Sequence, residues 1–250
     1  MEEELLVGVH SVLEALRAGR PLNKIWVATG PRRPEMREIL ALARERRVPV
    51  QKVERGFLKN LAGSLPAQGV AAQAAPVPYL DLEEVMEGLG ARPEPPLLLA
   101  LDQVEDPQNL GAILRSAEAT GVDAVILPQR RAAPVTAAVA RASAGAVAYL
   151  QLIRVPNLAR ALERLGDQGI TVVGLEAEAE RNLFSLDLRG PLALVAGGEA
   201  RGLRRLVKEK CQYLARLPMR GRVTSLNASA ATAVALYEVL RQRCFMNIFP

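Results

Sequence analysis

Three short segments in the second half of the chain combine polar side chains with small residues, a composition typical of catalytic turns. The first covers residues 102–115 and places Asn109 and Arg115 near the start of a candidate helix. In open α/β sheets, ligands bind beyond the carboxyl ends of the strands, where this turn would lie. The six-residue spacing does not put the two side chains on one helical stripe, but a pre-helical Asn109 could fold back towards Arg115. Taken alone, the segment is better explained by a helix cap and a solvated arginine.

The second segment, residues 192–202, is an apolar run that ends in Gly197 and Gly198 and is followed by Glu199. Paired glycines allow the backbone to approach a ligand closely. The GxxxxGK[ST] pattern is missing, and no GxGxxG follows the first strand of this half, so the sequence disfavours nucleotide hydrolysis and dinucleotide binding. The alternative is a glycine-bearing turn in which Glu199 interacts with the amino end of a helix.

The third segment, residues 217–233, reads LPMRGRVTSLNASAATA. It predicts a strand exit at a proline, then a basic turn, then a helix that Ser225 or Asn227 could cap. Small residues at a helix start usually indicate close packing. The order of the three segments is therefore more informative than any one of them.

Composition favours a polyanionic partner. The formal net charge is +5, and only five of the 32 basic residues are lysines. Guanidinium groups pair bidentately with phosphate, although codon bias or heat adaptation also explains an arginine excess. Aromatic residues make up 4% of the chain, which argues against extensive base stacking. The arginines that we expect to contact RNA are Arg17, Arg20, Arg32, Arg33, Arg130, Arg131, Arg201, Arg220 and Arg222.

Other residue types exclude several classes of protein. Cys211 and Cys244 lack a CxxC spacing, so we expect neither a metal site nor a disulfide framework, in keeping with a reducing cytoplasm. The acidic first residues and the interruption of the apolar stretch 135–152 by Arg141 predict no export and no membrane span. His10 is the only histidine and lies far from the three segments in sequence, which disfavours histidine acid–base catalysis.

Residues 77–95 collect prolines, glycines and acidic side chains, and they predict a linker between a small α/β domain of residues 1–76 and a larger domain of residues 96–250. Apolar runs alternate with helical stretches in the larger domain, which predicts an α/β fold with a buried parallel sheet between helices. The expected strands are 24–28, 48–53, 97–101, 124–127, 150–155, 171–175, 192–196 and 213–217, and the expected helices are 11–17, 34–46, 110–120, 135–144, 158–168, 202–210 and 226–243.

The stretches DPQNLGAILRSAEATGVDAVIL, LVAGGEARGL and RLPMRGRVTSLNASAATAVALYE resemble the three signature motifs of the SpoU/TrmH family of RNA ribose methyltransferases. The opening GVHSVLEAL and the following KIWVA are similar to the ribosomal protein L30e-like extension of one branch of that family. The resemblance implies a trefoil-knotted, parallel-sheet methyltransferase domain behind a small N-terminal RNA-binding domain, and a homodimer. Periodicity alone would favour an unknotted sheet, because knots are rare.

The resemblance also implies a site and a cofactor. Its motif residues correspond to Asn109, Arg115, Glu199, Ser225 and Asn227 as the catalytic set. S-adenosylmethionine (AdoMet) would be held by main chain around Gly197, Gly198, Leu217, Met219 and Leu226, with the small Ala230 leaving room, and no metal is required. Because a guanidinium stays charged, we expect Arg115 to bind a phosphate and stabilise a developing alkoxide instead of acting as a base.

The implied reaction is methyl transfer from AdoMet to the 2′-hydroxyl of a guanosine in structured RNA, with the P-site loop of 23S ribosomal RNA as the expected target. Within the same chemistry, the alternatives are a transfer-RNA ribose methyltransferase or a resistance-type ribosomal enzyme. A third alternative is a non-catalytic RNA-binding or ribosome-assembly factor, against which the presence of all five catalytic-set residues argues.

Overall fold

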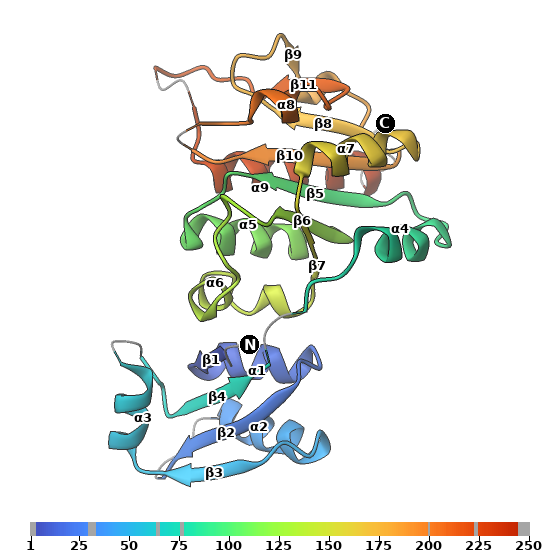
Figure 1. The fold of residues 1–250 in the computed structure, drawn as a ribbon. Helices are drawn as coiled ribbons and strands as arrows, with labels where there is room; N and C mark the ends of the chain where they lie inside the picture. The colour runs from blue at the N-terminus through green and yellow to red at the C-terminus, as the bar shows by residue number, and fades with distance from the viewer. Residues whose placement is uncertain are drawn as a thin grey trace. The chain divides into compact units, whose positions relative to one another are not determined.

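Strand pairing separates the protein into two sheets, one in each of two units (Figure 1). The computed structural model describes residues 4–29, 34–63, 66–75, 78–199, 201–222 and 225–244. One unit comprises Met1–Pro78 together with Pro134–Tyr149, and the other comprises Tyr79–Ala133 with Leu150–Pro250. Each unit is described by itself below.

The second unit contains a seven-stranded sheet in the order β7-β6-β5-β10-β8-β11-β9, in which every strand pair is parallel. The prediction of a buried parallel sheet is confirmed, because all six residues of the central strand β5 are buried. The strands are β5 (Leu97–Asp102), β6 (Ala124–Pro128), β7 (Gln151–Val155), β8 (Thr171–Leu175), β9 (Arg181–Asn182), β10 (Leu192–Gly197) and β11 (Tyr213–Arg216). β5 and β10 are neighbours in the sheet. From β5 the chain continues to β6 on one side, and from β10 it continues to β11 on the other side. In open α/β sheets, ligands bind where the connections diverge in this way.

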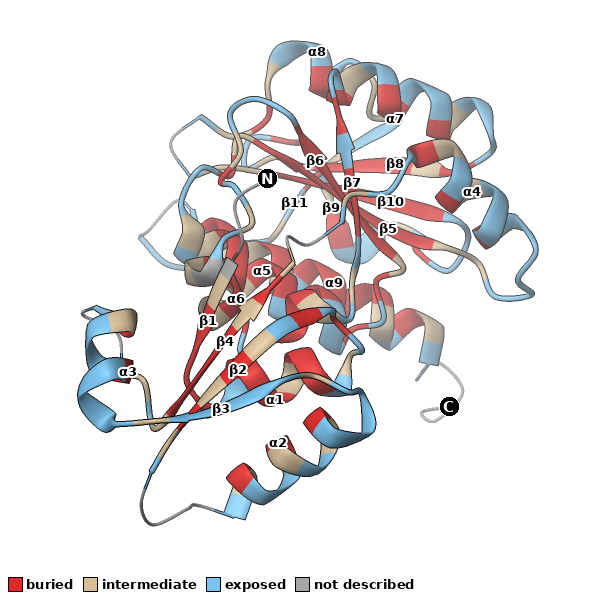
Figure 2. Cartoon of the chain, turned by 60° about the horizontal axis from the view of Figure 1, so that its bottom comes forward, coloured by how far each residue is buried: buried red, intermediate tan, exposed pale blue. Residues whose placement is uncertain are grey.

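Helices cover both faces of this sheet (Figure 2). On one face, α4, α7 and α8 share a buried cluster with alternate strand residues such as Leu98 and Ala100. On the other face, α5 packs against α9, and α9 contacts β10. The helices of this unit are α4 (Leu82–Gly90), α5 (Pro107–Ala119), α7 (Leu158–Asp167), α8 (Arg205–Lys208) and α9 (Ala228–Cys244), with a short 3-10 turn η2 (Leu183–Ser185).

The first unit contains a four-stranded sheet in the order β1-β4-β2-β3, with one parallel and two antiparallel pairs. The expected strands in β2 and β3 and the expected helices α1 and α2 are confirmed, whereas β1, α3 and β4 were not predicted. Its elements are β1 (Glu4–Val7), α1 (Val9–Arg17), β2 (Leu22–Ala28), α2 (Pro34–Glu45), β3 (Val50–Val53), α3 (Arg55–Ala62), β4 (Val70–Ala74), α6 (Ala137–Ala142) and the 3-10 turn η1 (Ala146–Ala148).

The two units do not follow the predicted boundaries. The expected linker, residues 77–95, contains α4, whose Leu82, Val85 and Leu89 are buried in the core of the second unit. Residues 134–149 were expected in the larger domain, but they belong to the first unit, where α6 packs on β1 and the Tyr149 hydroxyl donates to Glu14 at 2.6 Å. Proline and acidic content suggested a linker because periodicity is hard to recognise in a nine-residue helix.

The helix expected over residues 202–210 is only the four-residue α8, because Gly202 accepts a hydrogen bond from Gln103 in the loop after β5 and the residues before Arg205 are not helical. The other helices and strands expected in the second unit lie within a few residues of the predicted bounds. The trefoil knot stays a prediction.

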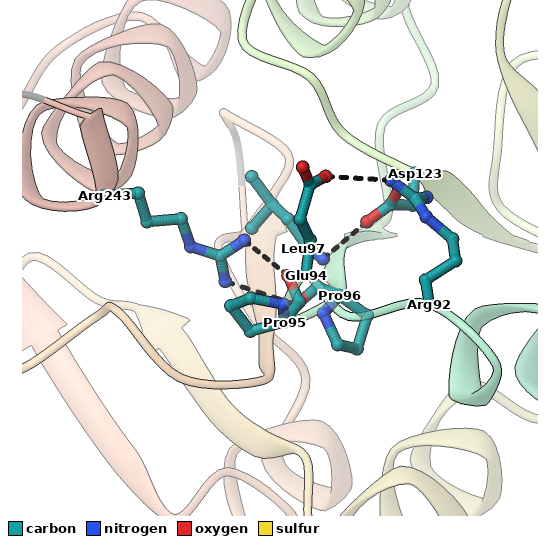
Figure 3. Close-up of polar contacts among 7 residues, drawn as sticks. All are labelled: Arg92, Glu94, Pro95, Pro96, Leu97, Asp123 and Arg243. Atoms are coloured by element: carbon teal, nitrogen blue, oxygen red, sulfur yellow. Dashed lines mark hydrogen bonds and ion pairs between the residues drawn. The ribbon is translucent and has the colours of Figure 1, made fainter.

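The amino ends of the central strands are held by the last turn of α9 (Figure 3). The Arg243 guanidinium donates to the carbonyls of Pro95 at 2.8 Å, Pro96 at 3.2 Å and Gly190 at 2.7 Å. Beside it, the Asp123 carboxylate accepts from the Leu97 amide at 2.8 Å and pairs with Arg92. These contacts join the start of β5 to the loop before β10 and to the end of α9.

We expect Arg243→Met to destabilise the protein by about 2–4 kcal/mol, because several partly buried carbonyls lose a charged donor. Chemical denaturation with an unchanged m-value measures this effect. Arg160→Met is the matched control, since Arg160 is exposed and its side chain has no hydrogen bond or ion pair among the described residues. Equal stability of the two variants would contradict a structural role for the Arg243 contacts.

Candidate functional site

A cavity of about 600 Å³ opens at the carboxyl ends of β8, β10 and β11 and reaches the start of α9. Its walls combine glycine backbone with apolar side chains and a few polar groups. The lining residues are Leu175, Glu176, Ala177, Ala196, Gly197, Gly198, Glu199, Arg201, Gly202, Ala215, Arg216, Leu217, Met219, Ser225, Leu226, Asn227, Ala228, Ala231 and Thr232. The second and third sequence segments therefore meet in one cavity.

The five expected cofactor residues Gly197, Gly198, Leu217, Met219 and Leu226 all line this cavity. The sixth, Ala230, does not, because it is exposed on a different side of α9. Ala231 and Thr232 occupy the corresponding part of the wall instead.

A second cavity, of about 440 Å³, adjoins the first and contains Asn109. The two share Gly198, Glu199, Arg201 and Ala228, so the first sequence segment meets the other two along this common wall. The remaining lining residues of the second cavity are Gln103, Val104, Glu105, Asp106 and Arg131. This cavity is the more polar in its side chains, and it lies between the loop after β5 and the Gly198–Glu199 turn.

The Asn227 side chain connects the three segments. Its Nδ2 donates to Asn109 Oδ1 at 2.9 Å and also to Glu199 Oε1. Its Oδ1 caps α9 by accepting from the Ser229 amide at 2.9 Å. The expectation that Asn227 or Ser225 caps this helix is met by Asn227, while Ser225 is exposed and lines the cavity.

Arg115 does not join this cluster. Asn109 lies within the first turn of α5, which Asp106 caps, so Asn109 points towards Asn227 and not back along the chain towards Arg115. The Arg115 side chain is exposed and has neither a hydrogen bond nor an ion pair among the residues that the structure describes. Four members of the expected catalytic set thus lie together, and the fifth faces solvent from the same helix.

The turn that carries Glu199 is fixed against the end of β5. The Gly198 amide donates to the Asp102 carbonyl at 2.8 Å, and a Cβ added to Gly198 would lie 2.1 Å from the Gln103 carbonyl oxygen. Gly197 packs equally closely on the Gly202 backbone. Both glycines are therefore required by backbone contact, which leaves no room for a side chain at either position.

Asp102 and Arg204 were not predicted as functional residues, but they secure the far end of the same turn. The Asp102 carboxylate is completely buried, accepts from the Arg204 amide at 2.8 Å and from Arg204 Nε at 2.7 Å, and forms an ion pair with it. The only sequence signal is an acidic residue at the end of an otherwise apolar buried strand. Three donors of Arg204 hold this buried carboxylate, so the pair fixes the local geometry. Its net contribution to stability is small, because burying the carboxylate costs desolvation energy.

Several arginines expected to contact RNA have structural roles instead. Arg20 is buried and donates to the Ala75 carbonyl at 2.7 Å, so it is not available to a phosphate. Arg17 pairs with Glu14 and Glu38 at the surface. The exposed Arg130, Arg220 and Arg222 remain candidates, as do Arg131 and Arg201 in the cavity walls, whereas Arg32 and Arg33 lie outside the described residues.

Within the described residues, no group of histidine, cysteine and acidic side chains is arranged to hold a metal ion, and no helix is long and apolar enough to cross a membrane. Cys211 lies near Asp102, and burial raises the pKa of its thiol to about 12, which makes it a poor nucleophile at neutral pH. Both Cys211 and Cys244 are unpaired.

We expect Asn227→Asp to destabilise the protein by about 1 kcal/mol, because the new carboxylate lies beside Glu199 and cannot donate to Asn109. The cap of α9 would survive, since a carboxylate also accepts from the Ser229 amide. Asn157→Asp is the matched control: Asn157 caps α7 with its Oδ1 and has no neighbouring carboxylate partner in the described contacts. Thermal unfolding that shifted equally in both variants would rule out the Asn227–Glu199 contact.

Comparison with known proteins places this site in a family. A model of the SpoU rRNA Methylase family matches residues 96–237, and one for RNA 2′-O ribose methyltransferase substrate binding matches residues 5–80. A protein of Bacillus subtilis (strain 168), named as the TrmH family tRNA/rRNA methyltransferase YacO, is 41% identical over 242 residues, which are 97% of each chain.

Solved structures agree. The SpoU methyltransferase AviRb from Streptomyces viridochromogenes, in complex with AdoMet, has a TM-score of 0.82 and 27% identity over 96% of this chain and 90% of its own. An AdoMet-bound rRNA methyltransferase from Sinorhizobium meliloti has a TM-score of 0.79 and 26% identity over 96% and 87% of the two chains. The cavity at β8, β10 and β11 thus belongs to a member of the SpoU methyltransferase family, as the three motifs predicted.

Proposed function

We propose that this protein transfers a methyl group from AdoMet to the ribose 2′-hydroxyl of a guanosine in the P-site loop of 23S ribosomal RNA. The observation that carries the proposal is the pair of adjoining cavities with a common wall at Gly198 and Glu199. The larger cavity combines glycine backbone, apolar side chains and polar groups, as a nucleoside cofactor requires, and the smaller one offers polar side chains to an acceptor. A methyl donor and an acceptor hydroxyl must meet in line, and the common wall is where they would meet.

The larger cavity fits AdoMet in its size and in its chemistry. Its volume lies in the usual range for small-molecule sites, and its walls offer backbone groups of Gly197, Gly198 and Leu217 with apolar contacts from Leu226 and Met219. When bound there, AdoMet supplies an electrophilic methyl group. Exposed apolar side chains at Met219 and Leu226, which are 40% and 43% accessible, would be covered by such a ligand.

The smaller cavity would hold the acceptor ribose. Asn109 and Glu199 face it from two sides and are linked through Asn227, so their polar atoms are held in place before any substrate arrives. Arg131 and Arg201 line the same cavity and could pair with phosphates of the bound strand. Ser225 lies in the neighbouring wall. In this arrangement the side chains orient the ribose and need no metal.

The substrate-binding unit favours ribosomal RNA over transfer RNA. A substrate-binding family model matches residues 5–80 ahead of the methyltransferase match, and the Sinorhizobium meliloti rRNA methyltransferase aligns with 96% of the chain. A transfer-RNA target and a non-catalytic RNA-binding role are the competing proposals. A cytoplasmic location follows from a ribosomal RNA substrate.

We further propose that the protein is a homodimer through the face of α9 turned away from the sheet. Val234 and Tyr237 are 42% and 54% accessible there, and Ala230 lies one turn earlier on the same side. An apolar stripe of this kind on a helix normally packs against another surface. A second copy would bring Arg115, on the neighbouring α5, close to the shared interface.

Mapping of methylated ribosomal RNA fragments by mass spectrometry, with the purified protein and AdoMet, tests the proposed activity. The expected result is one guanosine in the P-site loop that gains 2′-O-methylation. Modification of transfer RNA instead would replace the proposed substrate. AdoMet binding without any methylated RNA would favour the non-catalytic alternative.

We expect Arg115→Lys to lose most of the methyltransferase activity while it binds AdoMet with unchanged affinity. Lysine keeps the charge but loses the planar fork that pairs with phosphate and stabilises a developing alkoxide. Single-turnover kinetics measures the activity, and calorimetry measures the binding. Arg160→Lys, at an exposed position of α7, is the control. Turnover close to that of the unmodified protein would refute this role of Arg115.

A further inference from the structure

Glu176 has no role in the catalytic set, and it follows directly after β8 in the wall of the larger cavity. We propose that the Glu176 carboxylate accepts hydrogen bonds from the ribose 2′- and 3′-hydroxyls of AdoMet. Glu176 would then be the residue that selects a ribonucleoside as the cofactor. The inference rests on the proposed function, because it assumes that this cavity is the AdoMet site.

The first argument is that Glu176 has unused acceptor capacity. Its side chain is only 17% accessible and forms an ion pair with Lys208, with Oε2 2.5 Å from Nζ. This ammonium is the partner of Oε2, whereas no described residue donates a hydrogen bond to Oε1. Carboxylate oxygens that are mostly buried normally have donors, so Oε1 is suited to a ligand that brings hydroxyl groups.

The second argument is that three of the other polar side chains of the cavity are already engaged with protein partners. Glu199 and Asn227 bind each other, and the Thr232 hydroxyl donates to the Ala228 carbonyl at 2.7 Å. Around Glu176 the wall is made of small or apolar residues, including Leu175 and Ala215. A carboxylate in an apolar part of the wall is suited to fixing the orientation of one polar part of a ligand.

The third argument concerns charge and distinguishes the ribose from the cationic parts of AdoMet. The Lys208 ammonium already neutralises Glu176, so a sulfonium or amino group placed at this carboxylate would lie beside another positive charge. Neutral hydroxyl donors meet no such repulsion. A vicinal diol presents two of them side by side, and the lone pairs of Oε1 can accept from such a diol, as in acidic residues that bind the ribose of dinucleotides.

The Glu176–Lys208 pair also has a defined support. Lys208 is the last residue of α8, and its neighbour Val207 is buried against the sheet. A Cβ on Gly202 would lie 3.8 Å from Glu176 Oε2, so the carboxylate faces the same loop that carries Glu199. Ribose recognition and the catalytic turn are thus in contact through Gly202.

The test is calorimetry with S-adenosylhomocysteine and its 2′-deoxy and 3′-deoxy analogues, on the unmodified protein and on Glu176→Gln. We expect Glu176→Gln to raise the Kd for S-adenosylhomocysteine roughly tenfold, because a neutral acceptor replaces a charged one. The deoxy analogues should bind the unmodified protein more weakly than S-adenosylhomocysteine does. Their Kd values should differ little between the unmodified protein and Glu176→Gln. Glu178→Gln is the matched control, since Glu178 is exposed and does not line the cavity.

The outcomes separate the inference from the proposed function. Absence of S-adenosylhomocysteine binding by the unmodified protein would reject the AdoMet site itself. Normal binding with equal affinities for the deoxy analogues would overturn ribose recognition by Glu176, and this arm needs no variant to fold. A loss in Glu176→Gln that is larger for AdoMet than for S-adenosylhomocysteine would overturn it in favour of sulfonium binding. Lys208→Met should raise the Kd for S-adenosylhomocysteine when Glu176 is present. It should have little further effect when it is combined with Glu176→Gln.

Discussion

The ion pair between the buried Asp102 and the partly exposed Arg204 is the constraint on which the site depends. Asp102 ends the central strand β5, and Arg204 follows the neighbouring strand β10, so their contact joins the two strands at their carboxyl ends. Removing a charged partner from such a pair leaves the other without compensation, whereas together they hold one geometry. The Gly198 amide donates to the carbonyl of the same Asp102, so the residue that precedes Glu199 is anchored to the end of β5 as well.

Close backbone packing then determines which residues can occupy the turn. Gly198 lies against the Gln103 carbonyl and Gly197 lies against Gly202, so the cavity wall is bare main chain at these two positions. Across this wall Asn227 joins the first turn of α9 to Asn109 of α5. The same amide caps α9, and this links the stability of a long helix to the position of the polar groups in the site.

Much of this arrangement could be predicted from sequence. Apolar runs gave the parallel sheet, and the small and polar residues after those runs gave Gly197, Gly198, Glu199 and Asn227, because strand ends in such sheets meet at one edge. What could not be predicted depends on contacts distant in sequence. Ala230 was expected in the cavity because the sequence does not tell which side of α9 faces the cavity. Nothing in the sequence near Asp102 indicates that it pairs with Arg204, 102 residues later.

The two functional residues of α5 show how one helix can serve two surfaces. Asn109, in the first turn, is held inward by Asn227, whereas Arg115, less than two turns later, is exposed. All the hydrogen-bond donors of an exposed guanidinium that has no partner among the described residues are free to bind a phosphate. The arginine side chain loses conformational entropy only when such a partner binds it. The larger cavity is thus formed by residues of one chain, while the Arg115 guanidinium has no partner among the described residues. Under the proposed function, this separation would make methyl transfer depend on RNA docking, because AdoMet binding alone would leave Arg115 unpaired.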